Sequence, residues 1–386
     1  MKILIISNYA NGLILFRKEV LESFVKRGYE VIVSVPEDEN CKKLKPLGVR
    51  IVPSCLERRG MNPVKDLKLL MDYMKLIKAE KPDIALTYTI KPNLYGSLAC
   101  AIKKIPYLIN ITGFGTALEN PGLLGKALLL FYKIVTKRAA CVFFQNAGNQ
   151  KFMQDRGIAV KNSRLLPGSG VNLEEHPFVK YPSEEDGIRI LAVLRIMKDK
   201  GIEEYFKAAK AIHQKYPEVS FELVGEYEEE MREKYEPIIT ELKKQGTLKY
   251  YGHIDNVPEV MAQSHIIVHP SYHEGLSNVC LEAAACGRPV LTTDVPGCRE
   301  TVIAAQNSDD SPSGILLPVQ SSDDSPSGIL FPTKSSEALI LAIESILKLT
   351  FKQREEMGIA ARKHVEKNFS RQIVIDAYHD VIEKII

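Results

Sequence analysis

The chain of 386 residues lacks the sequence features of a disulfide scaffold, a zinc site and a membrane span. Its seven cysteines are an odd number and widely scattered, without a C-x-x-C pair or a cysteine and histidine cluster at zinc spacing. No apolar run approaches the roughly 20 residues that a membrane-spanning helix needs. The opening MKILIISNYANG is typical of a buried strand and a turn, not of an export signal. We therefore expect a reduced, cytoplasmic protein without a structural metal.

Negative charge is scarce in the first half of the chain. Residues 1–165 contain 27 lysines and arginines against 13 aspartates and glutamates, a balance of +14, and the remainder carries −11. A basic surface of this kind attracts polyanions such as nucleic acid, anionic lipid headgroups or a pyrophosphate. Basic residues spread over solvated helix faces would give the same count, so composition leaves both interpretations open.

Short β-rich runs alternate with helical patterns in both halves of the chain, which predicts parallel sheets covered by helices on both faces. A segment rich in proline, glycine and acid, residues 165–187, interrupts this alternation. We expect two Rossmann-like α/β domains, residues 1–168 and 169–370, followed by a C-terminal helix at 371–386 that packs back toward the first domain. Two such domains facing each other would place the carboxyl ends of their strands around a shared cleft, where open α/β sheets bind ligands.

A tandem repeat lies in the second domain. The sequence SDDSPSGILLP at residues 308–318 returns as SDDSPSGILFP at 322–332, with one substitution in eleven positions. We interpret the polar part as a duplicated surface loop without a direct function. One GIL copy is expected to supply a final strand, and the sequence does not distinguish which.

The segment HEGLSNVCLEAAACGRPVLTTDVPG, residues 273–297, carries two glutamates eight positions apart. Its pattern predicts a turn after a buried strand, then a helix of small residues and another strand. The carboxylates of Glu274, before the turn, and Glu282, in the helix, can accept hydrogen bonds from sugar and ribose hydroxyls. On spacing alone, Glu282 could equally be an exposed helix residue. The helix start offers unpaired backbone N–H groups to an anion near Gly275, Leu276, Ser277 and Asn278.

The same segment resembles the glutamate, seven residues, glutamate motif of the family four retaining glycosyltransferases, which have the two-domain GT-B fold. In LAVLRIMKDKGIEEYFKA, Arg195 and Lys200 are similar to the family's arginine and lysine that hold the nucleotide-sugar diphosphate. YYGHIDNVPEVMAQSHIIVHPSYHEG resembles the strand and loop that enclose the nucleotide base, with His253 and Ile254 beside it. The resemblance covers essentially the whole chain and implies Glu274 as the contact to the hydroxyls of the donor sugar.

The first half, with TYTIKPNLYG, NITGFGTALEN and VFFQN, resembles bacterial members that add a hexose or N-acetylhexosamine to a polyprenyl-diphosphate-linked sugar. The resemblance implies a UDP-sugar donor and a lipid-linked saccharide acceptor in capsule, O-antigen or glycoprotein glycan assembly. It implies no cofactor and no nucleic-acid partner. A UDP-N-acetylhexosamine epimerase and a non-catalytic nucleotide-sugar- or lipid-binding subunit remain as alternative functions.

The expected chemistry rests on cations. Arg195 and Lys200 can neutralise the charge that develops on the departing UDP diphosphate, although either could instead be a surface charge. Because the chain lacks an Asp-x-Asp motif, these cations and the helix terminus would replace a metal. In SNYANG, we expect Asn11 and Gly12 to form a turn that lets the backbone approach the donor, although Gly12 could be an ordinary turn glycine.

The first domain departs from the family pattern at one position. Many relatives have a catalytic-site histidine there, whereas all eight histidines of this chain lie between positions 176 and 379. Thr112 and Gly113 are expected to take over its contact to the donor sugar. Arg58, Arg59 and Lys91 are candidates for binding the acceptor's diphosphate.

Residues 122–140, GLLGKALLLFYKIVTKRAA, combine apolar positions with four basic residues, a composition suited to a helix lying in a headgroup layer. A helix packed on its own sheet would have a similar pattern. The charge asymmetry favours peripheral association with the anionic inner face of the cell membrane.

Overall fold

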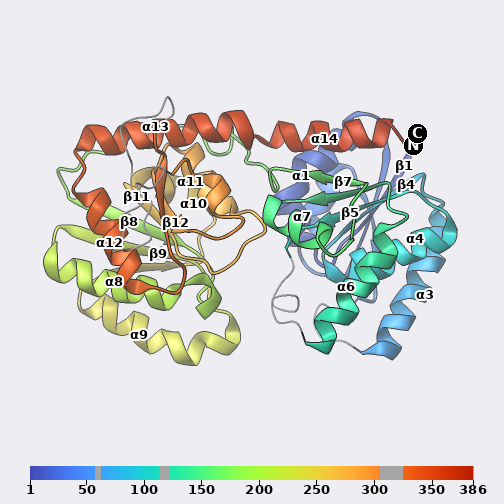
Figure 1. The fold of residues 1–386 in the computed structure, drawn as a ribbon, viewed down its shortest axis with the longest axis horizontal. Coiled ribbons are helices and arrows are strands. Elements are labelled where there is room, and N and C mark those ends of the chain that lie inside the picture. The colour runs from blue at the N-terminus through green and yellow to red at the C-terminus, as the bar shows by residue number, and fades with distance from the viewer. Residues whose placement is uncertain (57–61, 114–121, 305–324, 386) are drawn as a thin grey trace. The chain divides into compact units, whose positions relative to one another are not determined.

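The structure, a computed structural model, describes residues 1–56, 62–113, 122–304 and 325–385. These residues form two units (Figure 1), one comprising Met1–Gly170 with Arg371–Ile386 and the other Val171–Ser370. We call them unit 1 and unit 2. Among the described helices, none has both the length and the apolarity that crossing a membrane requires.

Unit 1 is built on a seven-stranded sheet in the order β3-β2-β1-β4-β5-β6-β7, and all of its strand pairs are parallel. The strands are β1 (Lys2–Ile6), β2 (Glu30–Val35), β3 (Arg50–Pro53), β4 (Ile84–Tyr88), β5 (Tyr107–Ile111), β6 (Cys141–Phe144) and β7 (Ser163–Leu165). The helices are α1 (Ala10–Lys26), α2 (Cys41–Leu44), η1 (Lys45–Leu47), α3 (Pro63–Glu80), η2 (Pro92–Gly96), α4 (Ser97–Lys103), α6 (Leu123–Thr136), α7 (Ala147–Gln154) and α14 (Arg371–Glu383). Strands β4 and β5 are buried along their whole length because helices cover both faces.

The C-terminal helix α14 packs on unit 1 in the same apolar cluster as α1. Tyr378 of α14 is fully buried, and its hydroxyl donates to the Asn110 side chain and accepts a 3.2 Å hydrogen bond from Tyr88. The Arg17 guanidinium lies 5.4 Å from the centre of the Tyr88 ring. These polar contacts fix α14 to the central strands through specific partners, in addition to apolar burial.

Unit 2 has a six-stranded parallel sheet in the order β10-β9-β8-β11-β12-β13. The strands are β8 (Ile188–Val193), β9 (Val219–Val224), β10 (Leu248–Gly252), β11 (Ile266–His269), β12 (Val290–Thr293) and β13 (Gly328–Phe331). The helices are α8 (Ile202–Lys215), α9 (Arg232–Lys244), α10 (Val257–Gln263), α11 (Asn278–Ala285), α12 (Ser336–Leu347) and α13 (Phe351–Asn368), with short turns η3 (Lys198–Lys200), η4 (Glu229–Met231) and η5 (Arg299–Thr301).

Strand β13 comes from the second copy of the tandem repeat, whose GILF sequence pairs with β12. The first copy lies outside the described residues. The structure therefore assigns a strand to the second copy, whereas the two nearly identical sequences did not indicate which copy forms it.

A buried arginine fixes the first segment of unit 2, which precedes β8. The Arg288 side chain is fully buried and donates to the backbone carbonyls of Val179, Lys180, Ala262 and Gly287. Burial lowers the pKa of Arg288 to about 10, so the guanidinium remains charged at neutral pH. Its hydrogen bonds hold the segment before β8 against the body of the unit.

Candidate active site

The strand order reverses between β8 and β11 in unit 2, and ligands of open α/β sheets bind at the carboxyl ends of strands where the order reverses. The chain after β8 leads into η3, which ends at Lys200, and the chain after β11 carries Ser271 and Glu274. The sequence alternation of strands and helices therefore delivers the predicted lysine and glutamate to one edge of the sheet.

Lys200 and Glu274 form an ion pair at this edge. The Lys200 Nζ lies 2.5 Å from Glu274 Oε1 and 3.4 Å from Ser271 Oγ. The approach depends on Gly201, whose φ is 71° and where an added Cβ would lie 2.1 Å from the carbonyl oxygen of Pro270. Any side chain at Gly201 would push Lys200 away from the end of β11.

A histidine completes the surroundings of Glu274. His269 is 3% exposed, and its Nε2 lies 3.1 Å from Glu274 Oε1. Burial is the largest effect on the Glu274 carboxyl and opposes its ionisation. The hydrogen bond from His269 and the charge of Lys200 outweigh burial, so together they lower the pKa of Glu274 well below its usual value. The carboxylate is therefore a permanent hydrogen-bond acceptor at neutral pH.

Gly297 supports the loop from the other side. Its φ is 87°, and a Cβ there would lie 2.6 Å from the carbonyl oxygen of Glu274. The carbonyl of Gly297 accepts a 2.7 Å hydrogen bond from the backbone N–H of Ser277, so the prediction that this N–H is unpaired is wrong. The sequence patterns assigned no role to His269 or Gly297. A glycine after a proline in VPG was the available signal for Gly297, whereas His269 is the last residue of a buried strand and matches a core pattern.

The predicted helix start follows the loop directly. Helix α11 begins at Asn278, and the hydroxyl of Ser277 accepts a hydrogen bond from the N–H of Cys280 at 3.3 Å as its N-cap. Leu276 is buried in an apolar cluster, so its side chain packs in the core and only its backbone faces the loop. Gly275 joins Glu274 to this cap and lies close to Gly297.

Glu282 lies in α11, with a side chain that is 27% exposed. Its Oε2 is 4.0 Å from Nε2 of His176, a residue that sequence analysis did not select. The His176 carbonyl accepts a 2.9 Å hydrogen bond from Arg362, which fixes the backbone at this position. Glu282 is thus neither fully exposed nor part of the group around Glu274.

Arg195 and Lys200 lie in different surroundings although they are only five positions apart in the sequence. Arg195 is exposed and its guanidinium pairs with Glu228, which follows β9. Lys200 is largely buried beside Glu274. Each of the two predicted diphosphate-binding cations is therefore paired with a carboxylate in this structure.

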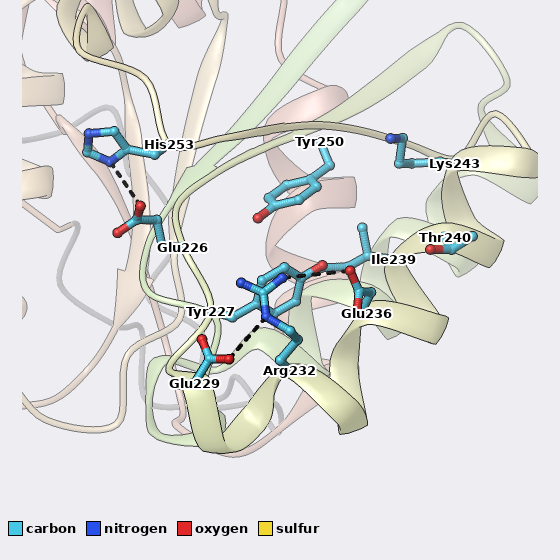
Figure 2. Close-up of a pocket in the computed structure, with 10 residues that line it drawn as sticks. All are labelled: Glu226, Tyr227, Glu229, Arg232, Glu236, Ile239, Thr240, Lys243, Tyr250 and His253. Atoms are coloured by element: carbon cyan, nitrogen blue, oxygen red, sulfur yellow. Dashed lines mark ion pairs between the residues drawn. The ribbon is translucent and has the colours of Figure 1, made fainter.

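A cavity of about 500 Å³ lies at the carboxyl ends of β9 and β10, bordered by α9. Figure 2 shows Glu226, Tyr227, Arg232 and Tyr250 around it, with His253 at one side. The Arg232 guanidinium lies 4.8 Å from the centre of the Tyr227 ring. The structure thus brings predicted His253 to a pocket that contains aromatic side chains and charges of both signs.

The two residues predicted to lie beside the nucleotide base, His253 and Ile254, have different surroundings. His253 lines the cavity, with its Nδ1 3.8 Å from Glu226 Oε1. Ile254 instead packs against the apolar cluster that contains Val224 and Met261. Its side chain therefore contributes to the core of unit 2.

The prediction of a turn at Asn11 and Gly12 is wrong. The residues after β1 that form the bend are 7–9, and α1 begins at Ala10, so both predicted residues lie in its first turn. A Cβ on Gly12 would lie 2.4 Å from the Tyr9 ring. The glycine leaves room for that ring, which covers the start of the helix.

The other predicted residues of unit 1 have mixed surroundings. Lys91 Nζ lies 3.0 Å from Asp66 Oδ1, and both side chains are largely buried. Thr112 and Gly113 follow β5 directly, and Gly113 has a φ of 144°. Arg58 and Arg59 lie outside the described residues. Much of the charge of Lys91 is therefore offset within unit 1.

Two protein families match this chain. Residues 174–364 match the family described as glycosyl transferases group 1, and residues 2–146 match glycosyl transferase 4-like. The two matched ranges follow the division into units 2 and 1.

Curated relatives match over most of the chain. The chain is 28% identical over 322 residues to an N,N'-diacetylbacillosaminyl-diphospho-undecaprenol alpha-1,3-N-acetylgalactosaminyltransferase of Campylobacter jejuni, covering 78% of this chain and 83% of the relative. It is 25% identical over 366 residues to the capsular polysaccharide biosynthesis glycosyltransferase CapM of Staphylococcus aureus, covering 92% and 90%.

The fold is similar to that of a solved structure, Anabaena HepE in complex with UDP and glucose, with a TM-score of 0.78 and 16% identity over the full length of both chains. At this identity the likeness concerns the fold alone. Together with the two parallel sheets, it confirms the predicted α/β fold class.

We expect the ionised Glu274 carboxylate to make stability depend on pH. Because its pKa is lowered in the folded chain, its contribution is complete above the ordinary glutamate pKa of about 4.3 and is lost as pH falls toward the folded value. The stability advantage of the wild type over Glu274→Gln should shrink by about 1 to 2 kcal/mol between pH 7 and pH 3, measured by urea unfolding. Glu226→Gln, an exposed control, should show no such change. If the difference in unfolding free energy between the wild type and Glu274→Gln is equal at both pH values, the lowered pKa of Glu274 is contradicted.

Proposed function

We propose that this chain, which belongs to the glycosyltransferases with group 1 and 4-like domains, transfers a hexose or N-acetylhexosamine from a UDP-sugar to a sugar linked to a polyprenyl diphosphate. The observation that carries the proposal is the largely buried group of Lys200, Glu274 and His269 at the point of strand reversal. A fixed carboxylate beside a cation suits a donor that presents hydroxyls next to a diphosphate.

The acceptor class is supported by the names of two relatives. The Campylobacter jejuni relative is named for a diphospho-undecaprenol acceptor. An Escherichia coli relative, 25% identical over 256 residues, covering 62% of this chain and 65% of the relative, is a UDP-Gal:alpha-D-GlcNAc-diphosphoundecaprenol alpha-1,3-galactosyltransferase. We extend the common part of these names, a sugar on a polyprenyl diphosphate, to this chain.

In the proposed reaction, Lys200 and Arg195 bind the donor's diphosphate and offset the charge that grows on it as the glycosidic bond breaks. Glu274 accepts hydrogen bonds from hydroxyls of the transferred sugar. The backbone N–H groups at the start of α11 face the donor's diphosphate. Glu282 accepts from the ribose, and the pocket beside His253 takes the base. We propose that transfer retains the anomeric configuration, and we assign no protein nucleophile.

We also propose that the transfer needs no metal ion. The positive charge next to the leaving group would come from Lys200 and Arg195 instead of a metal ion. The donor is then the only small molecule that the reaction requires besides its acceptor.

The proposed acceptor carries a lipid, and helix α6 supports a membrane-facing role for unit 1. One face of α6 packs in the core of the unit, through Leu128 and Tyr132 among others. The other exposes apolar side chains, with 88% of Leu123, 61% of Leu130 and 54% of Ile134 accessible. Lysines share this outer face at positions 126, 133 and 137. Helix α6 therefore packs on its own sheet and also presents an apolar and basic outer surface, the two features that the sequence left as alternatives.

Helix α3 packs in the same apolar cluster as α6 and so covers the same face of the sheet. It also exposes large apolar residues, Val64, Leu67 and Met71, beside exposed lysines at positions 65 and 68. Two helices on the same face of the sheet that expose apolar and basic residues fit peripheral binding to an anionic leaflet better than one helix alone. We propose that unit 1 binds the inner face of the cell membrane in this way.

The proposed reaction predicts acceptor-dependent release of UDP. Purified protein is incubated with a panel of UDP-sugars, with and without a short-chain polyprenyl-diphosphate-linked monosaccharide, and free UDP is measured. At least one donor should yield UDP only when the acceptor is present. An epimerase would convert the UDP-sugar without acceptor, and a binding subunit would bind it without turnover, so either result would replace the proposal.

Removing a cation should weaken nucleotide binding. A charge-assisted contact contributes about 1.5 to 3 kcal/mol, so Arg195→Ala and Lys200→Met should each weaken UDP binding about 10- to 150-fold by calorimetry. The control Glu228→Gln removes the resting partner of Arg195 and should leave UDP affinity unchanged or higher. Unaltered affinity in both cation variants would rule out their assignment to the diphosphate.

Reversing the charges on α6 should weaken membrane binding. Each lysine near an anionic surface contributes about 1 kcal/mol of attraction, which salt screens. Lys133→Glu with Lys137→Glu should therefore strongly reduce sedimentation with anionic liposomes and leave UDP affinity intact. Reversal of Lys42 and Lys43 on α2, whose helix packs in the other apolar cluster of unit 1, is the matched control. If wild-type protein does not sediment at low salt, the membrane proposal is wrong.

A further inference from the structure

His269 is held rigidly at the carboxyl end of β11. It pairs in register with Thr292 of β12, and the Thr292 hydroxyl donates a 2.9 Å hydrogen bond to the His269 carbonyl. The side chain is 3% exposed. The imidazole therefore has little freedom to turn away from Glu274.

The two nitrogens of this ring have different surroundings. Nε2 lies 3.1 Å from Glu274 Oε1, and Nδ1 is buried without a hydrogen-bond partner in the described part of the chain. An ionised carboxylate only accepts hydrogen bonds, so Nε2 carries the proton and donates it. A buried polar atom without a partner costs free energy, and an apolar side chain would avoid that cost. Core packing alone therefore does not explain a histidine at this position.

Lys200 and His269 contact the same oxygen of Glu274, from η3 and from β11. The proposed function requires Lys200 to turn toward the donor's diphosphate. Glu274 would then lose its cation while a second anion approaches. A buried carboxylate in that position would take up a proton or rotate away unless another donor held it.

We propose that His269 is a positioning residue for sugar transfer, which keeps Glu274 ionised and directed at the donor sugar while Lys200 binds the diphosphate. This inference rests on the proposed function and assigns a role to a residue outside the glutamate, arginine and lysine pattern. His269 itself touches neither substrate. Its effect reaches the reaction through one hydrogen bond to one carboxylate oxygen.

The two cysteine thiols near Glu274 do not take over this task. Cys280 of α11 and Cys298, after β12, both interact electrostatically with its carboxylate. Burial raises the pKa of Cys280 to about 11 and that of Cys298 well above its ordinary value, so both thiols are neutral. Ser271 contacts Lys200 and donates to the His273 carbonyl. Lys200 and His269 supply the interactions that lower the pKa of Glu274.

The test compares His269→Leu, which has no donor, with His269→Gln, whose side-chain amide nitrogen can donate from a similar position. The pH profile of kcat and the KM for the UDP-sugar are measured for both. Loss of a hydrogen bond to a charged group should lower kcat about 10- to 150-fold in the leucine variant, with KM changed less than about threefold. The acidic limb of its profile should move to higher pH, because Glu274 ionises less readily. The glutamine variant should recover most of kcat and the original limb.

A histidine control excludes a general packing effect. His265, just before β11, is also buried, and its ring contacts the Ser183 carbonyl. His265→Leu should destabilise the fold without moving the acidic limb. The positioning role is overturned if the glutamine and leucine variants lose equal activity, or if the limb stays in place in the leucine variant.

A second measurement does not depend on turnover, so it separates this inference from the proposed function. Urea unfolding at pH 3 and pH 7 gives the coupling between His269→Leu and Glu274→Gln in a double-mutant cycle. The two substitutions should be coupled at pH 7, and the coupling should be smaller at pH 3, because part of the advantage of the ionised Glu274 carboxylate is lost as pH falls toward its folded pKa. Additive effects at pH 7 would overturn the inference even if the enzyme is active, and strong coupling would support it even if no UDP is released.

Discussion

A carboxylate buried at the edge of a sheet must be surrounded by donors, and the local structure of unit 2 around Glu274 follows from that requirement. Lys200 reaches Glu274 because Gly201 lets η3 lie against the Pro270 carbonyl. Gly297 lets the next turn lie against the carbonyl of Glu274 itself. The two glycines come from different parts of the chain and serve one purpose, which is to bring backbone close to a single acidic side chain.

The strand order explains why these pieces meet. The connections that follow the neighbouring parallel strands β8 and β11 run toward opposite edges of the sheet, and ligands of open α/β sheets bind at such a reversal point. Unit 1 has the same reversal between β1 and β4. There the edge carries polar residues of a different kind, with Arg17 stacked on Tyr88 and a hydrogen-bonded group of Tyr88, Tyr378 and Asn110. Each unit therefore has a polar edge at its reversal point, but only unit 2 has a paired lysine and glutamate there among the described residues.

Sequence reasoning succeeded where a local pattern determines the result. Alternating strands and helices gave the α/β class, and the motif around Glu274 indicated a turn before a helix, which the structure has at α11. It failed at two positions. Asparagine and glycine favour turns locally, yet Asn11 and Gly12 lie in the first turn of α1, where the Tyr9 ring occupies the space that a Cβ on Gly12 would need. His269 ends an apolar strand and has the pattern of a core residue. Its contact with Glu274 exists only once the loop after β11 has turned back.

The ion pairs that Arg195 and Lys200 form without a bound donor affect turnover as well as donor binding. Arg195 is paired with Glu228 and Lys200 with Glu274 before any donor arrives. If these cations bind the diphosphate as proposed, binding is an exchange of one anion for another, and its net free energy is smaller than that of a free cation meeting a phosphate. The same carboxylates compete with UDP after transfer and so favour its release. Binding the donor and the UDP product equally tightly would not raise kcat. Exchange of the carboxylates for the diphosphate limits the affinity for both. It also keeps Arg195 and Lys200 close to the diphosphate, where negative charge develops during transfer.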